Sequence, residues 1–229
     1  MGTGPGQSPQ ARTRHADVAI ECSCYPAAMP ATDVLLDRRQ AADADQRVLL
    51  HGVSWKEFEL LLAIRGDDAG VRMTYLEGEL ELMTPSRSHE SIKKTIARIL
   101  EAYALRRDLT FEGFGSWTLK DAPQARAVEP DECYILGDAA KDRPDLAIEV
   151  VWTSGGLDKL QIYRGLGVQE VWLWRKGEIE VHLLDGDTYT RIDRGRLLPD
   201  LDLPLVARCI LEARSQTEAV KTFLASLRP

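Results

Sequence analysis

Two strand-like runs, residues 129–136 and 143–151, constrain most strongly what this chain can fold into. Each begins with a Pro-Asp or Glu-Pro-Asp step and continues with apolar and β-branched residues. The short polar segment between them holds Gly137, Asp138 and Asp142. Two such runs around a turn-forming segment predict an antiparallel β-hairpin.

The pairing of this hairpin decides which acids meet. A turn centred near Ala140 places Asp131 opposite Glu149, and opposed side chains have Cβ atoms about 4.5–5.5 Å apart. The other face is apolar and suits a core; it carries Tyr134, Leu136, Leu146, Ile148 and Val150. A slip of one residue would put the two acids on opposite faces. In the expected register, two carboxylates on rigid strands provide the hard oxygen ligands that a divalent cation needs.

The segments around the hairpin predict alternating helices and strands. Ser54 and Glu57 form a capping box for a short apolar helix that ends at Gly66. Strands 71–76 and 79–83 flank a two-residue turn, and a core-facing stripe predicts the main helix over 89–107. A further helix is expected over 158–166, closed by Gly167, and a last one over 217–227.

Several polar and aromatic side chains have both a functional and a structural interpretation. Glu79 is a candidate auxiliary acid of the site, whereas Glu81 fits a solvated strand face better. His89, at the start of the main helix, could bind phosphate, orient a water or ligate a metal, or it could be structural. Trp172 and Trp174 share one strand face, which favours packing under the C-terminal segment over base stacking.

These motifs, in this order, resemble a known family. The run from Tyr75 to Pro85, then His89, the Glu-Pro-Asp step, Pro144 to Val150, Lys159 with Tyr163, and Gly167 to Trp172 are similar to the Uma-two type of restriction endonuclease. That family lies in the PD-(D/E)xK nuclease superfamily, and the resemblance covers roughly residues 53–206. The superfamily's lysine, two residues after the acid, is Val151 here, and the resemblance implies that Lys159 substitutes for it.

The resemblance and the carboxylate pair together suggest a metal-dependent hydrolysis. Mg²⁺ keeps several waters and needs only one or two carboxylates, so the hypothesis assigns it to Asp131 and Glu149, with Mn²⁺ as a substitute. The carbonyl of Val151 would complete the shell, and Lys159 would orient the attacking water or neutralise the phosphate. Asp145 lies about 13 Å along the strand from Glu149, too far to share the ion, and is expected to support the loop.

The composition limits which partners and metal sites are expected. The formal net charge of -7 argues against tight, non-specific DNA binding, but it omits the charge of bound metal ions. The four cysteines form no CxxC pair, so no zinc site is expected. No apolar run approaches the roughly 18 residues of a membrane span, and no signal peptide is evident, which favours the cytoplasm.

The sequence thus predicts an α/β (α+β) protein with a restriction-endonuclease-like mixed sheet flanked by helices and extra β-hairpins. Residues 1–50 are expected to be poorly structured, 51–206 to form the nuclease-like domain and 207–229 a C-terminal helix. The main hypothesis is a Mg²⁺-dependent DNA endonuclease, possible as a homodimer. The alternatives are a non-catalytic interaction module on the same fold, and a metal-dependent hydrolase with another substrate.

Overall fold

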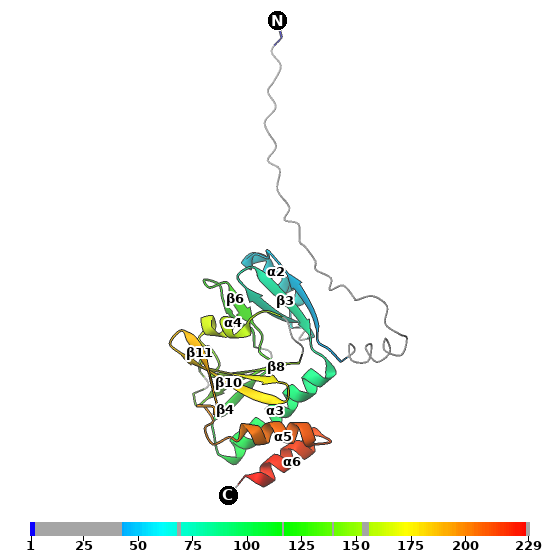
Figure 1. Cartoon of the computed structure of the whole chain (residues 1–229). Helices are drawn as coiled ribbons and strands as arrows, with labels where there is room; N and C mark the ends of the chain where they lie inside the picture. Colours follow the sequence, from blue (N-terminus) through cyan, green and yellow to red (C-terminus); the bar gives the residue numbers. More distant parts are fainter. Residues whose placement is uncertain (3–42, 68–69, 116, 139, 153–155, 228–229) are drawn as a thin grey trace, which may run out of the picture.

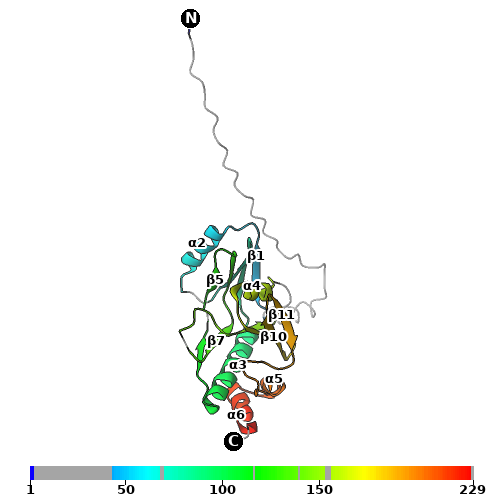
Figure 2. The ribbon, with the colours of Figure 1, turned by 90° about the vertical axis from the view of Figure 1, so that its left-hand side faces the viewer.

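The computed structural model of the protein describes residues 1–2, 43–67, 70–115, 117–138, 140–152 and 156–227 (Figure 1). Two β-sheets lie in separate layers, with a short helix, α4 (Lys159–Leu166), between them. Helix α2 (Trp55–Arg65) covers the far side of the first sheet. The second sheet is covered by α3 (Arg87–Arg106), α5 (Leu203–Glu212) and α6 (Gln216–Ser226). Figure 2 shows the same order of layers from the side. This is the α+β class with helix-flanked sheets that the sequence predicts.

The first sheet has five strands in the order β1-β3-β2-β6-β5, and its paired strands are antiparallel. Its members are β1 (Gln46–Leu50), β2 (Arg72–Leu76), β3 (Glu79–Thr84), β5 (Leu119–Asp121) and β6 (Arg126–Val128). The expected turn between β2 and β3 is confirmed: Glu77 and Gly78 both have positive φ, 49° and 102°, as a tight hairpin requires.

The second sheet has six strands in the order β11-β10-β9-β8-β7-β4. Its members are β4 (Phe111–Phe114), β7 (Glu132–Leu136), β8 (Leu146–Val151), β9 (Glu170–Arg175), β10 (Glu178–Asp185) and β11 (Thr188–Ile192). Strands β8 and β9 run parallel, with α4 as the crossover, while the other described pairs of this sheet are antiparallel. The sheet is therefore mixed, as expected.

The predicted register of the central hairpin is confirmed. Cys133 pairs with Ala147 and Tyr134 with Leu146, so continuing the ladder sets Asp131 opposite Glu149. The apolar face packs into the core with α3, α5 and α6, and Trp172 and Trp174 are buried in the same cluster. Packing, not base stacking, therefore accounts for these two tryptophans. Asp145 supports the loop, since its carboxylate accepts the Leu136 amide at 2.8 Å.

The structure differs from the sequence-based expectations near both ends of the chain. The expectation of little structure over residues 1–50 is wrong for Gln46–Leu50, because backbone pairing with β3 orders them as β1. Residues 3–42 lie outside the described residues. Helix α5 was not expected; its N-cap Asp202 accepts the Leu205 amide, and its buried residues pack against the second sheet. It spans the proposed boundary at residue 206, and the division into domains stays a prediction.

Candidate active site

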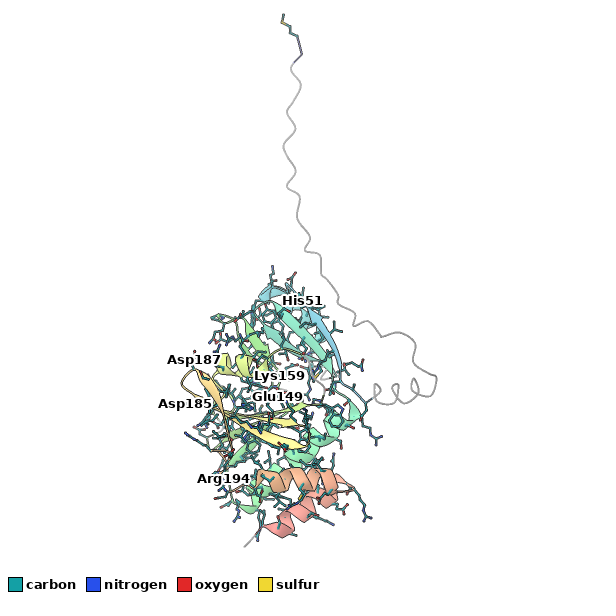
Figure 3. The ribbon with its side chains drawn as sticks, in the orientation of Figure 1. His51, Glu149, Lys159, Asp185, Asp187 and Arg194 are labelled. Carbon is teal, nitrogen blue, oxygen red and sulfur yellow. The ribbon has the colours of Figure 1, made fainter. Side chains whose placement is uncertain are left out.

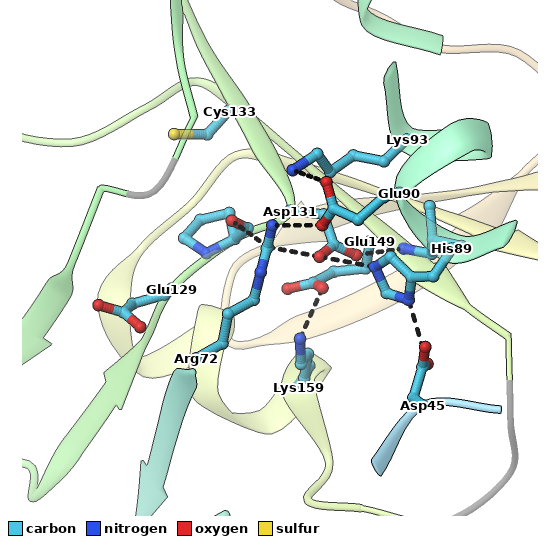
Figure 4. Close-up of polar contacts among 12 residues, drawn as sticks. Asp45, Arg72, His89, Glu90, Lys93, Glu129, Asp131, Cys133, Glu149 and Lys159 are labelled. Carbon is cyan, nitrogen blue, oxygen red and sulfur yellow. Dashed lines mark hydrogen bonds and ion pairs between the residues drawn. The ribbon is translucent and has the colours of Figure 1, made fainter. Parts of the chain in front are cut away.

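Asp131 and Glu149 lie side by side (Figure 4), and both are buried. Asp131 directly precedes β7, and Glu149 is the fourth residue of β8. The residues have relative exposures of 0% and 1%. Strand pairing brings them together, since they occupy opposed positions on one face of the hairpin. Two adjacent buried carboxylates repel one another, so the site favours cations.

Asp131 is surrounded by donors from three elements. Arg72 Nη1 on β2 donates to Oδ1 at 2.5 Å, and the amide of Val150 donates to Oδ2 at 2.7 Å. His89 Nε2 lies 2.9 Å from Oδ1 and forms an ion pair with it, although its angle is not that of a hydrogen bond. Burial alone would raise the pKa of Asp131, but His89, Arg72 and Lys159 outweigh it and lower that pKa well below its usual range.

His89 reaches the site from the first turn of α3. Ser86 caps this helix by accepting the His89 amide at 3.2 Å, and Asp45 accepts the Ser86 amide at 2.8 Å. The second oxygen of Asp45 lies 3.1 Å from His89 Nδ1. Burial opposes a charged imidazole, but Asp131 and Asp45 on its two nitrogens raise the pKa of His89 to about 9. His89 is therefore a cation that bridges two buried carboxylates.

Glu149 is held by the helix that follows it. Asp158 caps α4 and sets Lys159 and Tyr163 on the face turned towards β8. Lys159 Nζ lies 2.6 Å from Glu149 Oε2, and the Tyr163 hydroxyl donates to Oε1. Burial and the neighbouring Asp131 raise the pKa of Glu149, which Lys159 only partly offsets. Burial would lower the pKa of Lys159, but Glu149 and Asp131 raise it, so the amine stays charged.

A cavity of about 850 Å³ connects this cluster with the surface. Glu149 and Lys159 form part of its wall, together with Glu81 on β3 and Trp152 after β8. Glu81 is buried at 3% exposure and accepts the Leu157 amide at 3.3 Å. The expectation that Glu81 belongs to a solvated strand face is therefore wrong, because its face of β3 turns inward towards α4.

The donor atoms fit a hard divalent cation in type. Asp131 Oδ2 and both oxygens of Glu149 each accept a single donor, which leaves lone pairs for a further ligand. Mg²⁺ needs one or two carboxylates and fills its shell with water. Within the described part of the chain, no group of three or more His, Cys, Asp or Glu side chains is placed to hold a metal.

The structure brings together most, but not all, of the residues selected from the sequence. Asp131, Glu149, Lys159 and His89 form one contact network. Val151 lines the cavity two residues after Glu149. Glu79 lies apart: its carboxylate pairs with His51, which Figure 3 places far from Glu149 and Lys159. The two acids share a face of β3, but Glu79 is the first residue of the strand, beside the β2–β3 turn, and Glu81 is the acid that lines the cavity.

Sequence reasoning missed two members of the network. Arg72 is 4% exposed and also donates to the Pro130 carbonyl at 3.0 Å. The available signal was a charged residue within an otherwise apolar strand, which requires a buried partner. Asp45 precedes β1 in a stretch without periodicity, and nothing in the local pattern marks it.

Among the described residues, no helix is both long and apolar enough to cross a membrane. No curated protein matches the chain. Among solved structures, it is similar to a "putative nuclease belonging to DUF820" from Anabaena variabilis, with 15% sequence identity and a TM-score of 0.43. That match covers 75% of this chain and 99% of the other.

The sequence profile of one family matches residues 55–212, which contain every member of the site network except Asp45. The family is described as Uma2, "Putative restriction endonuclease". The match covers more than half of the chain and includes the second sheet, the first sheet except β1, and all the described helices except α6. This protein therefore belongs to the Uma2 family.

Proposed function

We propose that the protein hydrolyses phosphodiester bonds in DNA as an endonuclease that depends on Mg²⁺, with Mn²⁺ able to substitute. One observation carries the proposal: two buried carboxylates face each other on paired strands, and Lys159 lies 2.6 Å from one of them beside an open cavity. Membership of the Uma2 family supports the same reaction class.

Asp131 and Glu149 would hold the cation, and the carbonyl of Val151 is the proposed additional ligand. When bound, the metal supplies polarisation of the phosphate and a more acidic water. Lys159 is proposed to orient that water or to neutralise the scissile phosphate. Its position supports this role, because Glu149 fixes the ammonium at the cavity wall and the raised pKa keeps it charged.

The remaining residues of the network would prepare the carboxylates. Arg72 and His89 offset the charge of Asp131, and the Tyr163 hydroxyl fixes the orientation of Glu149. Without these partners, two acids at this depth would repel each other and take up protons. We propose His89 and Arg72 as supporting residues, and we assign Glu79 no role in the reaction because it pairs with His51.

A second candidate function has one observation in its favour. Arg72 and His89 already neutralise Asp131, so the network is internally compensated before any metal is added. A family member that has lost turnover and acts as an interaction module would need only this compensated state. The homodimer and the cytoplasmic location both stay predictions.

Plasmid cleavage separates the two functions. Purified protein is incubated with supercoiled plasmid and, separately, with circular single-stranded DNA, each with Mg²⁺ or Mn²⁺, alongside Asp131→Asn, Lys159→Met and the matched control Glu79→Gln. We expect wild type and Glu79→Gln to cleave at least one of the two DNAs. Lys159→Met should be slowed by about 10²–10³-fold, the usual cost of removing one charge-stabilising group, and Asp131→Asn at least as much. Circular dichroism confirms that each variant is folded. No cleavage of either DNA by wild type with either metal would favour the interaction module.

A further inference from the structure

Resting on the proposed function, we propose that the substrate is single-stranded DNA, which enters through the cavity beside Glu149 and stacks a base on Trp152. Asp131 and Glu149 are 0% and 1% exposed, and Figure 3 shows Glu149 and Lys159 between the two sheets. A scissile phosphate must therefore enter the protein to reach them.

The cavity that gives access is bounded on several sides. Its walls come from β3, β8, β9, the start of α4 and the end of α5. A duplex holds each phosphate on a rigid double strand, so the partner strand would have to enter the same space. A single strand has no such partner, and it can bend one phosphate inward towards Glu149 and Lys159. The burial of the site thus favours an unpaired strand.

Trp152 provides a surface for a base. Its side chain lines the cavity, yet the residue is 42% exposed, unlike Trp172 and Trp174, which are buried. The indole Nε1 donates to the carbonyl of Asp43 at 2.8 Å, which fixes the ring orientation. Stacking on an aromatic ring is the usual way in which proteins hold single strands without reading their sequence. In an intact duplex the base faces are already stacked, so Trp152 could not use them.

Positive charge around the same cavity suits a phosphate backbone. Arg47, Arg175 and Lys176 line it from β1 and from the end of β9. Arg47 and Arg175 have acidic neighbours, Asp45 at 3.7 Å and Glu180 at 3.1 Å, which hold the guanidinium groups in place. Lys176 is exposed on the turn between β9 and β10. Together with Lys159, these cations outnumber the three acids of the lining, Glu81, Glu149 and Asp158, so the cavity can attract phosphate on a chain whose formal net charge is -7.

Binding without catalysis tests this directly. Fluorescence anisotropy is measured with a labelled single-stranded oligonucleotide and with a blunt duplex of the same sequence, in EDTA so that neither is cut. We expect the wild-type protein to bind the single strand at least tenfold more tightly. Equal or tighter binding of the duplex would overturn the proposal, and so would no binding of either nucleic acid.

Variants locate the binding surface. Trp152→Ala should weaken single-strand binding about tenfold or more, and Trp152→Phe should restore most of it, because a smaller aromatic still stacks. Lys176→Ala should weaken binding and reduce the salt dependence by about one phosphate contact. Phe114→Ala and Lys221→Ala are the matched controls, since neither residue lines the cavity. Wild-type affinity in Trp152→Ala would overturn the proposal.

This test fails separately from the test of hydrolysis. Plasmid nicking with metal can be present while the single-strand preference in EDTA is absent, which would leave the nuclease proposal and remove this one. The reverse result, single-strand binding that depends on Trp152 without any cleavage, would keep this surface and remove the catalytic role of Asp131 and Lys159.

Discussion

Glu129 and Asp131 stand on either side of Pro130, and both are buried acids paired with an arginine. Glu129 is 1% exposed; Arg65 lies 2.7 Å from one of its oxygens, and the Met73 amide donates at 2.9 Å. Asp131 has the corresponding partners, Arg72 and the Val150 amide. By burial and by hydrogen bonding the two residues are nearly equivalent.

The difference lies in what surrounds each pair. The Thr118 hydroxyl completes the contacts of Glu129 at 2.8 Å, and these partners tie α2, β2 and the start of β5 together. Asp131 instead faces a second carboxylate, Glu149, which borders the cavity. Burial and an arginine partner therefore do not identify a reactive acid. A second carboxylate opposite the first, with access from outside, is the more informative feature.

Replacing each acid by its amide tests this comparison most severely. Glu129→Gln should lower the free energy of unfolding by about 3–5 kcal/mol, because it leaves the Arg65 guanidinium without its buried counter-charge. Asp131→Asn should also be destabilised, because Arg72 and His89 lose the carboxylate they face, and removal of the repulsion from Glu149 offsets only part of that loss. Urea denaturation of both variants gives the two values. If Glu129→Gln is as stable as wild type, Glu129 is not a structural acid and the comparison with Asp131 does not hold.

Plasmid cleavage should separate the variants of Glu129 and Asp131. Below its unfolding midpoint, Glu129→Gln should keep most of the plasmid cleavage, whereas Asp131→Asn should lose it. A double variant that also replaces Arg65 by Met should recover part of the lost stability, because it removes the unpaired charge.

The central hairpin shows how far the sequence could predict this site. Alternation along β8 and the position of the turn predicted which residues face each other, since a strand repeats every two residues. The capping box at Ser54 and the helix end at Gly167 were equally local. Lys159 and Tyr163 share a face because they are four residues apart. These features depend on few neighbours, and the structure confirms them.

The partners of the hairpin depend on contacts between distant segments. Arg72 meets Asp131 across 59 residues, and Asp45 meets His89 across 44. Neither pairing follows from periodicity, because it depends on how the two sheets are placed. Glu81 illustrates the same limit: alternation predicted its face of β3 but not that α4 would cover it. The local sequence pattern thus predicted the two facing carboxylates, whereas their cationic partners depend on tertiary packing.

The pH dependence of stability should also separate Asp131 from Glu129, because only Asp131 contacts a titrating histidine, His89. The pKa of His89 rises from 6.5 to about 9 on folding, so its contribution is fully present below pH 6.5 and is lost as the pH rises through 9. The loss is up to about 3 kcal/mol for a shift of this size. It should be visible as a falling free energy of unfolding in urea titrations between these pH values.

His89→Gln is the control for this effect, because it removes the titrating group that faces Asp45 and Asp131. The difference in stability between wild type and this variant should shrink between pH 6.5 and 9. Glu129→Gln should keep the wild-type slope, since its partners are an arginine, a hydroxyl and a backbone amide. If Glu129→Gln abolished the fall in the free energy of unfolding between pH 6.5 and 9, the titrating group would lie beside Glu129 and not at His89.

Metal binding gives the smallest and most selective contrast. An ion that binds only the folded state stabilises it by about 2.7 kcal/mol at one hundred times its dissociation constant. We expect Mg²⁺ or Mn²⁺ to raise the unfolding temperature of wild type and of Glu129→Gln, and EDTA to reverse the change. Asp131→Asn should show no such rise, because only the carboxylate opposite Glu149 can share an ion with it. An equal rise in Asp131→Asn would mean that the metal binds elsewhere, and the convergence of the two strands would then have no bearing on the chemistry.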